Sequence, residues 1–571
     1  MDGYVSDRVV DMLRDLGCRY LPLNPGSSFR GLHDSLVNYG GQTGPQIILC
    51  AHEEIAVSAA HAFAKATGEV GYAAVHDLVG LMHASMAVYD AWCDRTPMVV
   101  LGGGGPADPQ HRGPIDWFHS ANTQSALVRP FVKWDDDPVT PQAMLDGIVQ
   151  ARRLAASAPQ GPTYVTLDAA LQEQEDPGLV NRASQGLSAD PPLAARRAEI
   201  ELAVDLLMNA DLPVVIAGRV GLDATCTPLL VELSEALAAP CRDERNHTAL
   251  PTAHQLNLNG DRDLLDDADV VLGVDLHDLS YVLNTRRRAD HAPAVIDLSV
   301  NTLAVRSWAN AGAGLRPADV RLVADPKHGL EQLLEAVRTR VGAESAESSS
   351  NRAERAEQIG IRHGKLRQSQ RDQLANRWDE SPISVPRLVA EVYDAVKELP
   401  WLLTLRNTRS WPEGVWKFDR GGRYLGHSGG GGVGYGPGAL LGGGLAARDR
   451  GEFAVGIIGD GDLLFAPGAL WSAVHYQVPM LIVVNNNRSY YNDEAHQTVV
   501  ATNRNRPVRN ADIGTRMDHP VVDFASIASG QGAWAQGPVT DPEQLRPTLQ
   551  AAVARVLQGD VALVDVHTGN K

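Results

Sequence analysis

The sequence predicts an α/β protein built from three doubly wound, parallel-sheet domains. Its 571 residues suffice for about three domains of ordinary size. In three stretches of the chain, short apolar runs of strand type alternate with helical patterns, which is typical of parallel sheets covered by helices on both faces. Polar stretches separate the three. We therefore expect domains at residues 1–175, 193–342 and 383–571, with residues 343–382 as a linker.

The expected strands are the apolar runs within each domain. In the first domain these are residues 46–50, 71–75, 98–101 and 163–167, with helices at 54–66 and 84–91. The second domain has runs at 213–217, 270–274 and 294–298. The third has runs at 454–458, 481–484 and 562–566, with one helix at 469–476 between the first two. Residues 342–380 are rich in Glu, Ser, Arg and Gln, which predicts a solvated helix and connector.

Composition and charge exclude several classes of protein. The net charge is −18, from 51 basic and 69 acidic residues, and this argues against nucleic-acid binding, which needs clustered Lys and Arg. No apolar run is long enough to cross a membrane. The first residues, MDGYVSDRVVDMLRDLG, carry acids and lack the apolar segment of a secretory signal.

The five cysteines are Cys18, Cys50, Cys93, Cys226 and Cys241. They are odd in number and widely spread, and no CxxC motif occurs. This pattern is typical of reduced, mostly buried thiols, so we expect a cytoplasmic protein in which none of them is catalytic.

The strongest motif lies in the third domain. The run AVGII is followed at once by Gly459-Asp460-Gly461-Asp462, and the next run, MLIVV, leads into three asparagines ending at Asn487. Because the carboxyl ends of neighbouring parallel strands lie side by side, Asp460 and Asn487 can converge on one hard cation. The flanking glycines allow a tight turn and close approach of backbone N–H groups to a phosphate.

This segment, GDGDLLFAPGALWSAVHYQVPMLIVVNNNRSY, resembles the cofactor signature of thiamine-diphosphate-dependent enzymes: GDG, about 25–30 residues, then NN. The resemblance implies that Asp460 and Asn487 ligate Mg²⁺ by their side chains and Ser489 by its backbone carbonyl. Gly459, Gly461, Asp462 and Asn487 would then lie at the diphosphate. Asp462 departs from the family pattern, because Ser, Gly or Ala is usual there and an acid beside a diphosphate must point away or touch metal-bound water.

A glycine-rich stretch, residues 429–444, precedes this motif and contains a GxGxxG match. A nicotinamide site is disfavoured because no strand precedes the match. By the family resemblance, this stretch wraps the middle of the cofactor, and Val433 is the aliphatic residue that props the cofactor in its bent shape. Asn407 and Thr408 match a position that contacts the diphosphate, although polar loop residues would look the same.

The segment ILCAHEEIAVSAAHAFAKATG resembles the pyrimidine-side motif of the same family. The family spacing makes Glu53 the carboxylate that bonds the aminopyrimidine ring and activates the cofactor, with Glu54 as its neighbour. Without that resemblance, acids at a helix start would only balance the helix dipole.

The first domain also offers candidates for the substrate pocket. By resemblance to benzoylformate-decarboxylase-like members, Ser27 in NPGS and His76 in VHDLVG lie there, and His76 could shuttle a proton near neutral pH. His119 lies where acetolactate-synthase-like members often carry Gln. His83 departs from the pattern, since Asn is common at its position. His277 and His427 are weaker candidates and could be surface residues.

The resemblance covers essentially the whole chain and implies pyrimidine-binding, central and diphosphate-binding domains in that order. It implies a decarboxylase of 2-oxo acids that can also join the acyl unit to an aldehyde or ketone. The alternatives are an acetolactate-synthase-like carboligase, in which FAD could occupy the central domain, and a catalytically silent, cofactor-binding partner subunit. In this family each site forms between two subunits, which implies a homodimer or homotetramer.

Overall fold

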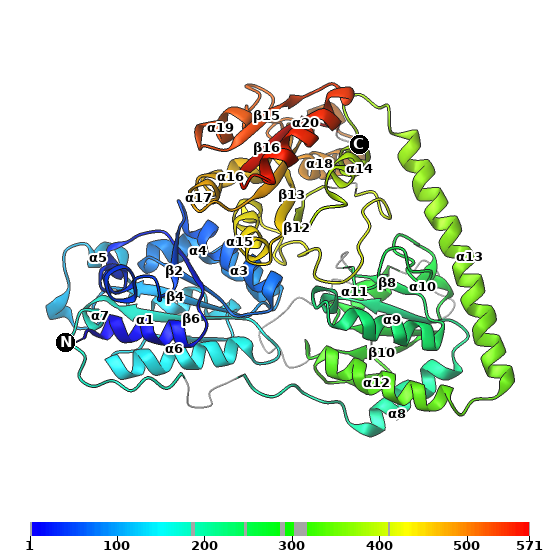
Figure 1. Ribbon diagram of the computed structural model, residues 1–571, viewed down its shortest axis with the longest axis horizontal. Helices are drawn as coiled ribbons and strands as arrows, with labels where there is room; N and C mark the ends of the chain where they lie inside the picture. Colours follow the sequence, from blue (N-terminus) through cyan, green and yellow to red (C-terminus); the bar gives the residue numbers. More distant parts are fainter. Residues whose placement is uncertain are drawn as a thin grey trace. The chain divides into compact units, whose positions relative to one another are not determined.

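The computed structural model describes residues 3–183, 189–244, 248–285, 292–301, 317–408 and 411–569 (Figure 1). Two compact units are formed. The first contains Met1–Asp190, Asp379–Ser410 and His427–Lys571, and the second contains Pro191–Trp378 and Trp411–Gly426. The described residues form three sheets, all of them parallel, so the predicted α/β class with three parallel-sheet domains is confirmed.

The first sheet has six strands in the order β2-β1-β3-β4-β6-β5. The four predicted strands are present as β2 (Gln46–Leu49), β3 (Gly71–Val75), β4 (Met98–Gly104) and β6 (Pro162–Asp168). Two further strands were not predicted, β1 (Tyr20–Leu23) and β5 (Trp134–Asp136). Both are short, β1 contains a proline and β5 is mostly acidic, so neither has the apolar pattern that identifies a strand.

Helices α3 (Glu53–Thr67) and α4 (Asp77–Cys93) follow β2 and β3 and carry most of the candidate residues of this domain. Helix α3 is rich in alanine and buried along nearly its whole length, and it ends at Gly68, which adopts a left-handed conformation. The other helical segments include α1 (Val5–Asp15), η1 (Ser27–Phe29), α2 (Arg30–Asp34), α5 (Asp116–His119), α6 (Pro141–Ala156) and α7 (Ala169–Gln172).

The third sheet has the order β12-β13-β14-β16-β15. Its strands are β12 (Trp401–Arg406), β13 (Phe453–Gly459), β14 (Met480–Asn486), β15 (Trp534–Val539) and β16 (Val561–His567). Between β13 and β14, the structure has two short helices, α16 (Asp460–Phe465) and α17 (Ala469–His475), so the prediction of a single crossover helix was wrong. The helix predicted at residues 469–476 is present as α17, and the short helix α16 before it was not predicted.

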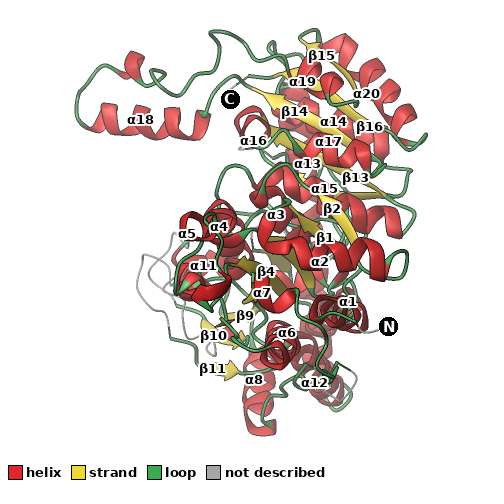
Figure 2. Ribbon diagram, turned by 90° about the vertical axis from the view of Figure 1, so that its left-hand side faces the viewer, coloured by secondary structure: helices red, strands yellow, loops and turns green. Residues whose placement is uncertain are grey.

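The third sheet is covered by helices on both faces (Figure 2). They include α14 (Val385–Val396), α15 (Tyr435–Asp449), α19 (Phe524–Gly530) and α20 (Pro542–Val556). Helix α18 (Tyr491–Asn503) differs from these, because it stands away from the sheet and none of its residues is buried.

The first and third sheets share one compact unit because α3 packs along α15. The two helices run in the same direction. A Cβ atom on Gly438 would lie 2.6 Å from the Ser58 side chain, and one on Gly442 would lie 1.9 Å from the Ala59 carbonyl oxygen. The contact therefore requires glycine on α15, and it places the start of α3 beside the start of α15.

The second unit has a sheet of five parallel strands in the order β11-β10-β9-β7-β8. These are β7 (Pro213–Ala217), β8 (Cys241–Asp243), β9 (Val270–Val274), β10 (Ala294–Leu298) and β11 (Val320–Leu322). Its longest helices are α8 (Arg197–Asn209), α9 (Cys226–Leu237), α12 (Pro326–Val341) and α13 (Ala346–Asn376). Helix α13 is the predicted solvated helix, with Ile359 as its one buried residue among those described.

Residues 411–426 belong to the second unit, although they lie inside the range expected for the third domain. The Thr252 N–H donates to the Phe418 carbonyl, and the Gly422 N–H donates to the Gly221 carbonyl. Trp416, Phe418 and Tyr424 are buried in this segment. The aromatic residues therefore make this stretch part of the central core.

No helix in the described part of the chain is long and apolar enough to span a membrane. The five cysteines, all of them described, form no disulfide, and all but Cys93 are buried.

Candidate active site

Two strand ends of the third sheet bring the predicted oxygen ligands together. Gly459 at the end of β13 pairs with Asn485 near the end of β14. Asp460 follows directly after Gly459, and Asn487 follows two residues after Asn485. The Ser489 N–H donates to the Asn487 Oδ1 atom at 3.0 Å, and Arg488 between them has a φ of +58°, which turns the chain sharply. The two strand ends that precede Asp460 and Asn487 are therefore neighbours at the carboxyl-terminal edge of the sheet, as the motif predicts.

Asp460 is the central group of this edge. It is 4% exposed, its Oδ1 atom accepts the Gly461 N–H at 2.9 Å, and its buried Oδ2 atom has no hydrogen-bond partner among the described residues. Burial raises the pKa of Asp460 to about 6, while the backbone N–H groups of Gly461, Arg488 and Ser489 act in the opposite direction. A buried carboxylate oxygen without a partner is costly unless something else satisfies it.

The donors at this edge suit a hard divalent cation. Mg²⁺ prefers carboxylate, amide and carbonyl oxygens together with phosphate oxygens. Asp460 has one unpaired oxygen, and the Asn487 oxygen has a second lone pair beyond the one that accepts the Ser489 N–H. Gly461 lies against the Tyr490 ring, where a Cβ atom would come within 2.6 Å, so the turn has no room for a side chain there. The residues present therefore fit a metal that bridges to a diphosphate.

Asp462, the acid that departs from the family pattern, is directed at protein groups. Its Oδ1 atom accepts the Gly434 N–H at 2.7 Å, and its Oδ2 atom accepts from the Asn407 side-chain amide at 3.3 Å. Burial raises the pKa of this carboxyl group. Asp462 thus ties the turn after β13 to the start of α15 and to the end of β12. The hydroxyl of Thr408, the residue after Asn407, is buried and has no hydrogen-bond partner among the described residues.

The glycine run before α15 packs against α4. Cβ atoms on Gly429, Gly430 and Gly432 would each come within 2.6–2.7 Å of α4 side chains or of Asp94 just after that helix. The Gly430 N–H donates to Asp90 Oδ1 at 2.9 Å, and the Lys65 ammonium donates to the His427 carbonyl at 2.9 Å. The run is therefore held by the first domain.

The end of the glycine run is open. Val433 is 42% exposed, and Gly434 has a φ of +109°, which favours glycine. An apolar side chain held outward by glycines on both sides is available to contact a ligand. The contact of Val433 with the middle of the cofactor stays a prediction.

The two acids at the start of α3 point to different places. Glu53 is 6% exposed, and its Oε2 atom lies 3.2 Å from His83 Nδ1. Glu54 faces the third domain, where a Cβ atom on Gly434 would lie 2.9 Å from its Oε1 atom. Burial, and then the negative charge of Asp462, raise the pKa of Glu54 to about 7. Of the two acids, Glu53 is therefore the one that faces the histidines of the first domain.

His76 and His119 form a hydrogen-bonded pair, as expected if both belong to one site. His76 Nε2 lies 3.1 Å from His119 Nδ1, and His76 Nδ1 lies 2.7 Å from the Ser28 hydroxyl. Burial is the main cause that lowers the pKa of His76, so its neutral form is favoured. Asp77 beside them is buried in a left-handed conformation, and its pKa is raised to about 7, mainly by burial.

The structure places Ser28, and not Ser27, on His76. Ser27 is exposed, whereas Ser28 is 4% exposed. The family pattern pointed to the first serine of NPGSS. The sequence holds no signal that singles out the second serine, which is buried with Phe29 on the short helix η1 only in the folded chain.

Two weaker candidates have other partners. His277 lies 3.2 Å from Glu244 in the second unit, and His427 contributes its backbone carbonyl to Lys65.

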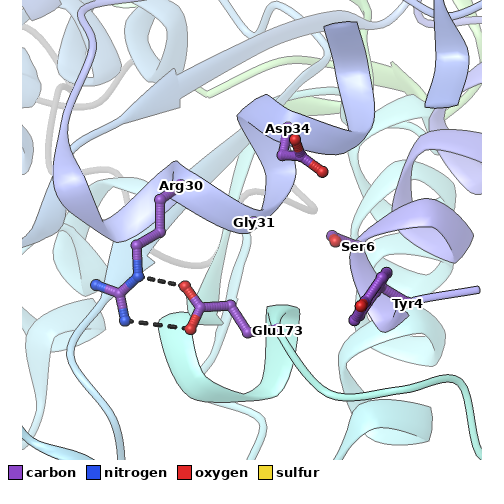
Figure 3. A pocket seen from close by; sticks show the side chains of 6 residues that line it. All are labelled: Tyr4, Ser6, Arg30, Gly31, Asp34 and Glu173. Atoms are coloured by element: carbon purple, nitrogen blue, oxygen red, sulfur yellow. Dashed lines mark hydrogen bonds and ion pairs between the residues drawn. The ribbon is translucent and has the colours of Figure 1, made fainter. Parts of the chain in front are cut away.

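A separate cavity of about 280 Å³ lies in the first domain (Figure 3). It is lined by Tyr4, Ser6, Arg30, Gly31, Asp34 and Glu173, and Arg30 forms an ion pair with Glu173 at its side. None of the predicted site residues lines this cavity.

Comparison with known proteins agrees with the geometry. Residues 4–126 match the model described as thiamine pyrophosphate enzyme, N-terminal TPP binding domain, and residues 407–566 match the corresponding C-terminal TPP binding domain. The chain is 28% identical to benzoylformate decarboxylase of Pseudomonas aeruginosa over 91% of each chain. It is 24% identical to the acetolactate synthase isozyme 3 large subunit of Escherichia coli, over 98% of this chain and 94% of that one.

A solved structure shows the same fold. The thiamine diphosphate-dependent 4-hydroxybenzoylformate decarboxylase of Rhodococcus jostii superposes with a TM-score of 0.75 over 99% of each chain, at 20% identity. The two segments that match the family models contain Glu53 in the first and both Asp460 and Asn487 in the second. The chain therefore belongs to the thiamine pyrophosphate enzymes.

Proposed function

We propose that the protein is a thiamine-diphosphate- and Mg²⁺-dependent decarboxylase of 2-oxo acids, similar to benzoylformate decarboxylase and able to join the acyl unit to an aldehyde or ketone. The observation that carries this proposal is the buried, unpaired Oδ2 atom of Asp460 at the strand edge that also presents Asn487. The similarity to benzoylformate decarboxylase over 91% of the chain supports the choice of reaction.

Asp460, Asn487 and the Ser489 carbonyl would hold the Mg²⁺ ion, and Val433 with the glycines before α15 would line the middle of the cofactor. When bound, the cofactor supplies an acyl-anion equivalent and accepts the electrons released as CO₂ leaves. The chain's own residues then bind, orient and move protons. Glu53 would bond the pyrimidine ring with the oxygen that is not engaged by His83.

The His76–His119 pair would handle the proton. Because burial favours neutral His76, this imidazole can accept a proton during the reaction. Ser28 fixes the orientation of the His76 ring through the 2.7 Å contact at Nδ1. A pair of imidazoles of this kind can also bind the carboxylate of a 2-oxo acid.

The second candidate is an acetolactate-synthase-like carboligase, which the 24% identity over 98% of the chain supports. A silent partner subunit is disfavoured because Glu53, Asp460 and Asn487 are all retained. We further propose a homodimer or homotetramer with sites between subunits, and a cytoplasmic location, in keeping with five cysteines that form no disulfide.

A panel of 2-oxo acids, incubated with thiamine diphosphate and Mg²⁺, tests the proposal. Release of CO₂ with an aldehyde supports the decarboxylase, and release with an acetohydroxy acid supports the carboligase instead. Turnover of no acid would contradict both.

Glu53→Gln tests the role of the activating carboxylate. We expect kcat to fall by about 10²–10⁴, as for loss of an acid–base group, while cofactor affinity stays within about threefold. Calorimetry measures the affinity. Near-wild-type turnover would show that Glu53 is not the activating group.

A further inference from the structure

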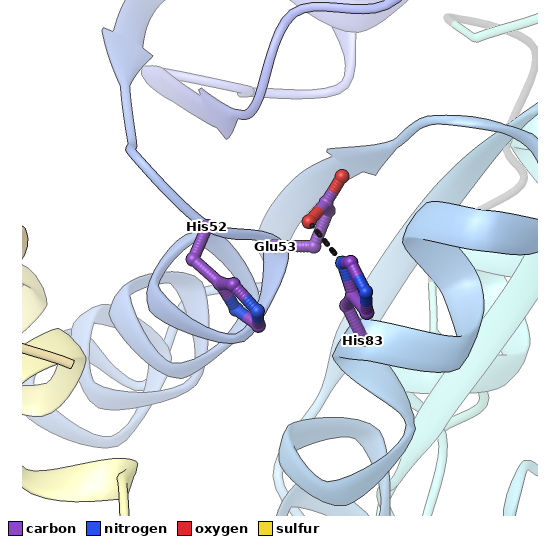
Figure 4. A group of neighbouring side chains, drawn as sticks. All are labelled: His52, Glu53 and His83. Carbon is purple, nitrogen blue, oxygen red and sulfur yellow. Dashed lines mark hydrogen bonds and ion pairs between the residues drawn. The ribbon is translucent and has the colours of Figure 1, made fainter. Parts of the chain in front are cut away.

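His83 is the polar side chain that contacts Glu53. Its Nδ1 atom lies 3.2 Å from Glu53 Oε2, and the two side chains differ in exposure, 58% for His83 and 9% for Glu53 (Figure 4). His83 comes from α4 and Glu53 from the start of α3, so the contact joins the two helices. In the figure, the imidazole approaches the carboxylate from one side and leaves the other oxygen uncovered by it.

The backbone of α4 leaves room for that second oxygen. Gly80 lies three residues before His83, on the same face of the helix. A Cβ atom on Gly80 would come within 2.9 Å of Glu53 Oε1. Gly80 and His83 therefore lie on the same side of the carboxylate. His83 contacts Oε2, and the glycine has no side chain to cover Oε1.

His52 holds the exposed His83 ring in place. The two imidazoles stack with their centroids 4.8 Å apart and their planes 18° apart. His52 Nδ1 accepts the Glu54 N–H at 3.2 Å, so this nitrogen carries no proton. Burial, and then His83, lower the pKa of His52, so its neutral form is favoured. A neutral ring fixed at the start of α3 is a platform on which His83 can keep its orientation.

This arrangement suits a hydrogen bond better than a metal. His52, Glu53 and His83 are close enough to hold an ion, with one ligand atom of each within 4.8 Å of the others. However, nearly parallel stacked rings direct their nitrogen lone pairs alongside one another and not toward one point. His52 Nδ1 is already occupied by the Glu54 N–H. Zinc binding by these three residues is the alternative to a hydrogen bond, and the experiment below separates the two.

We propose that His83 is a positioning residue, which holds Glu53 by one carboxylate oxygen, directs the other at the cofactor's pyrimidine ring, and makes cofactor activation depend on the charge of an imidazole. This inference rests on the proposed function and extends it. The titratable groups whose charge reaches Glu53 are His83 on α4, His52 before α3 and His76 before α4. A positive charge at position 83 would attract the negative charge of Glu53, and this would change how strongly the Glu53 carboxyl group hydrogen-bonds to the pyrimidine ring of the cofactor.

The test compares His83→Leu, which removes the hydrogen bond, with His83→Asn, which keeps a donor but cannot titrate. Three quantities are measured: affinity for thiamine diphosphate with Mg²⁺ by calorimetry, the rate of hydrogen–deuterium exchange at the thiazolium C2 position by NMR, and the pH dependence of that rate. We expect His83→Leu to slow the exchange by about tenfold or more while affinity stays within about threefold. His83→Asn should recover much of the rate and remove the part of its pH dependence that comes from the imidazole.

Gly80→Ala offers an independent test that leaves His83 intact. The added methyl group would crowd Glu53 Oε1, so the exchange rate should fall without loss of affinity. His328→Asn is the matched control, because His328 lies 3.9 Å from Glu331 on the surface of α12 and contacts no candidate site residue.

The failures are distinguishable. If the wild-type protein binds no thiamine diphosphate, both the proposed function and this inference are overturned. If it binds the cofactor but His83→Leu exchanges at the wild-type rate, only the role of His83 is overturned. An effect on KM for the 2-oxo acid alone would make His83 a substrate contact. Micromolar Zn²⁺ binding to the apoprotein that His83→Asn abolishes would make the cluster a metal site, and would also overturn the inference.

Discussion

Helices α3 and α15 run side by side in the first unit, yet they begin with opposite chemistry. Helix α3 starts with Glu53 and Glu54 after a histidine, whereas α15 starts after a run of glycines that ends at Gly434. The first domain thus supplies acidic side chains at the start of its helix, and the third supplies bare backbone there, with Asp460 and Asn487 at the neighbouring strand ends. If the proposed function holds, two similar parallel sheets divide the work of one site, with proton chemistry on one side and binding of the diphosphate and metal on the other.

The sharpest way to break this division is Asp460→Asn. Loss of the carboxylate should weaken Mg²⁺-dependent cofactor binding by more than about 100-fold, since even groups behind the metal ligands are worth 10–100-fold. Calorimetry with and without Mg²⁺ measures this. Asp462→Asn is the matched control, because an amide oxygen can still accept the Gly434 N–H and affinity should change by less than about tenfold. Equal effects of the two variants would contradict the assignment of the metal ligand.

The contact between the helices can be broken by Gly442→Ala. The new methyl group would meet the Ala59 carbonyl oxygen at 1.9 Å, so we expect a loss of about 1–3 kcal/mol in the free energy of unfolding, which corresponds to several degrees in Tm. Gly364→Ala on α13 is the control. Nothing lies within 4 Å of that position, so alanine should be neutral or stabilising by up to about 1 kcal/mol. If Gly442→Ala has the same Tm as the wild type, the helices do not pack as described.

The smallest expected effect concerns Asp90, which holds the glycine run from α4. Burial, and then the charge of Asp94, raise its pKa from 3.8 to about 8. A carboxyl group whose folded pKa is raised favours folding at low pH, and this contribution is lost as the pH rises from about 4 to about 8. Asp90→Asn keeps the acceptor for the Gly430 N–H and removes this loss. Its Tm relative to the wild type should therefore rise by at least about 2 °C between pH 5 and pH 8, as measured on the apoprotein. A difference in Tm that does not change with pH would contradict the raised pKa.

Apolar strands were the most predictable part of the fold, because a buried parallel strand needs a continuous run of Val, Ile and Leu. The runs at β3, β7, β9 and β10 were predicted to the residue. Strands β1 and β5 escaped because one is interrupted by Pro22 and the other reads Trp134-Asp135-Asp136. Their pairing depends on neighbours far along the chain, which no local pattern contains.

The candidate site divides in the same way. The Asp460–Asn487 edge follows from the spacing of two strand ends, so the sequence predicts it. The direction of Asp462 does not, because its partners Gly434 and Asn407 lie 28 and 55 residues away. The contact of His83 with Glu53 and of Ser28 with His76 likewise joins elements that are neighbours only after folding.

The stretch from Trp411 to Gly426 has a practical consequence for dissecting the protein. A fragment that begins at residue 379 would carry Trp416, Phe418 and Tyr424 without the central residues that cover them, and a fragment that stops at residue 378 would leave an unfilled gap in the central core. A simple cut between domains is therefore not enough to express the parts separately. This stretch must also be moved, for example by fusing it to the end of α13.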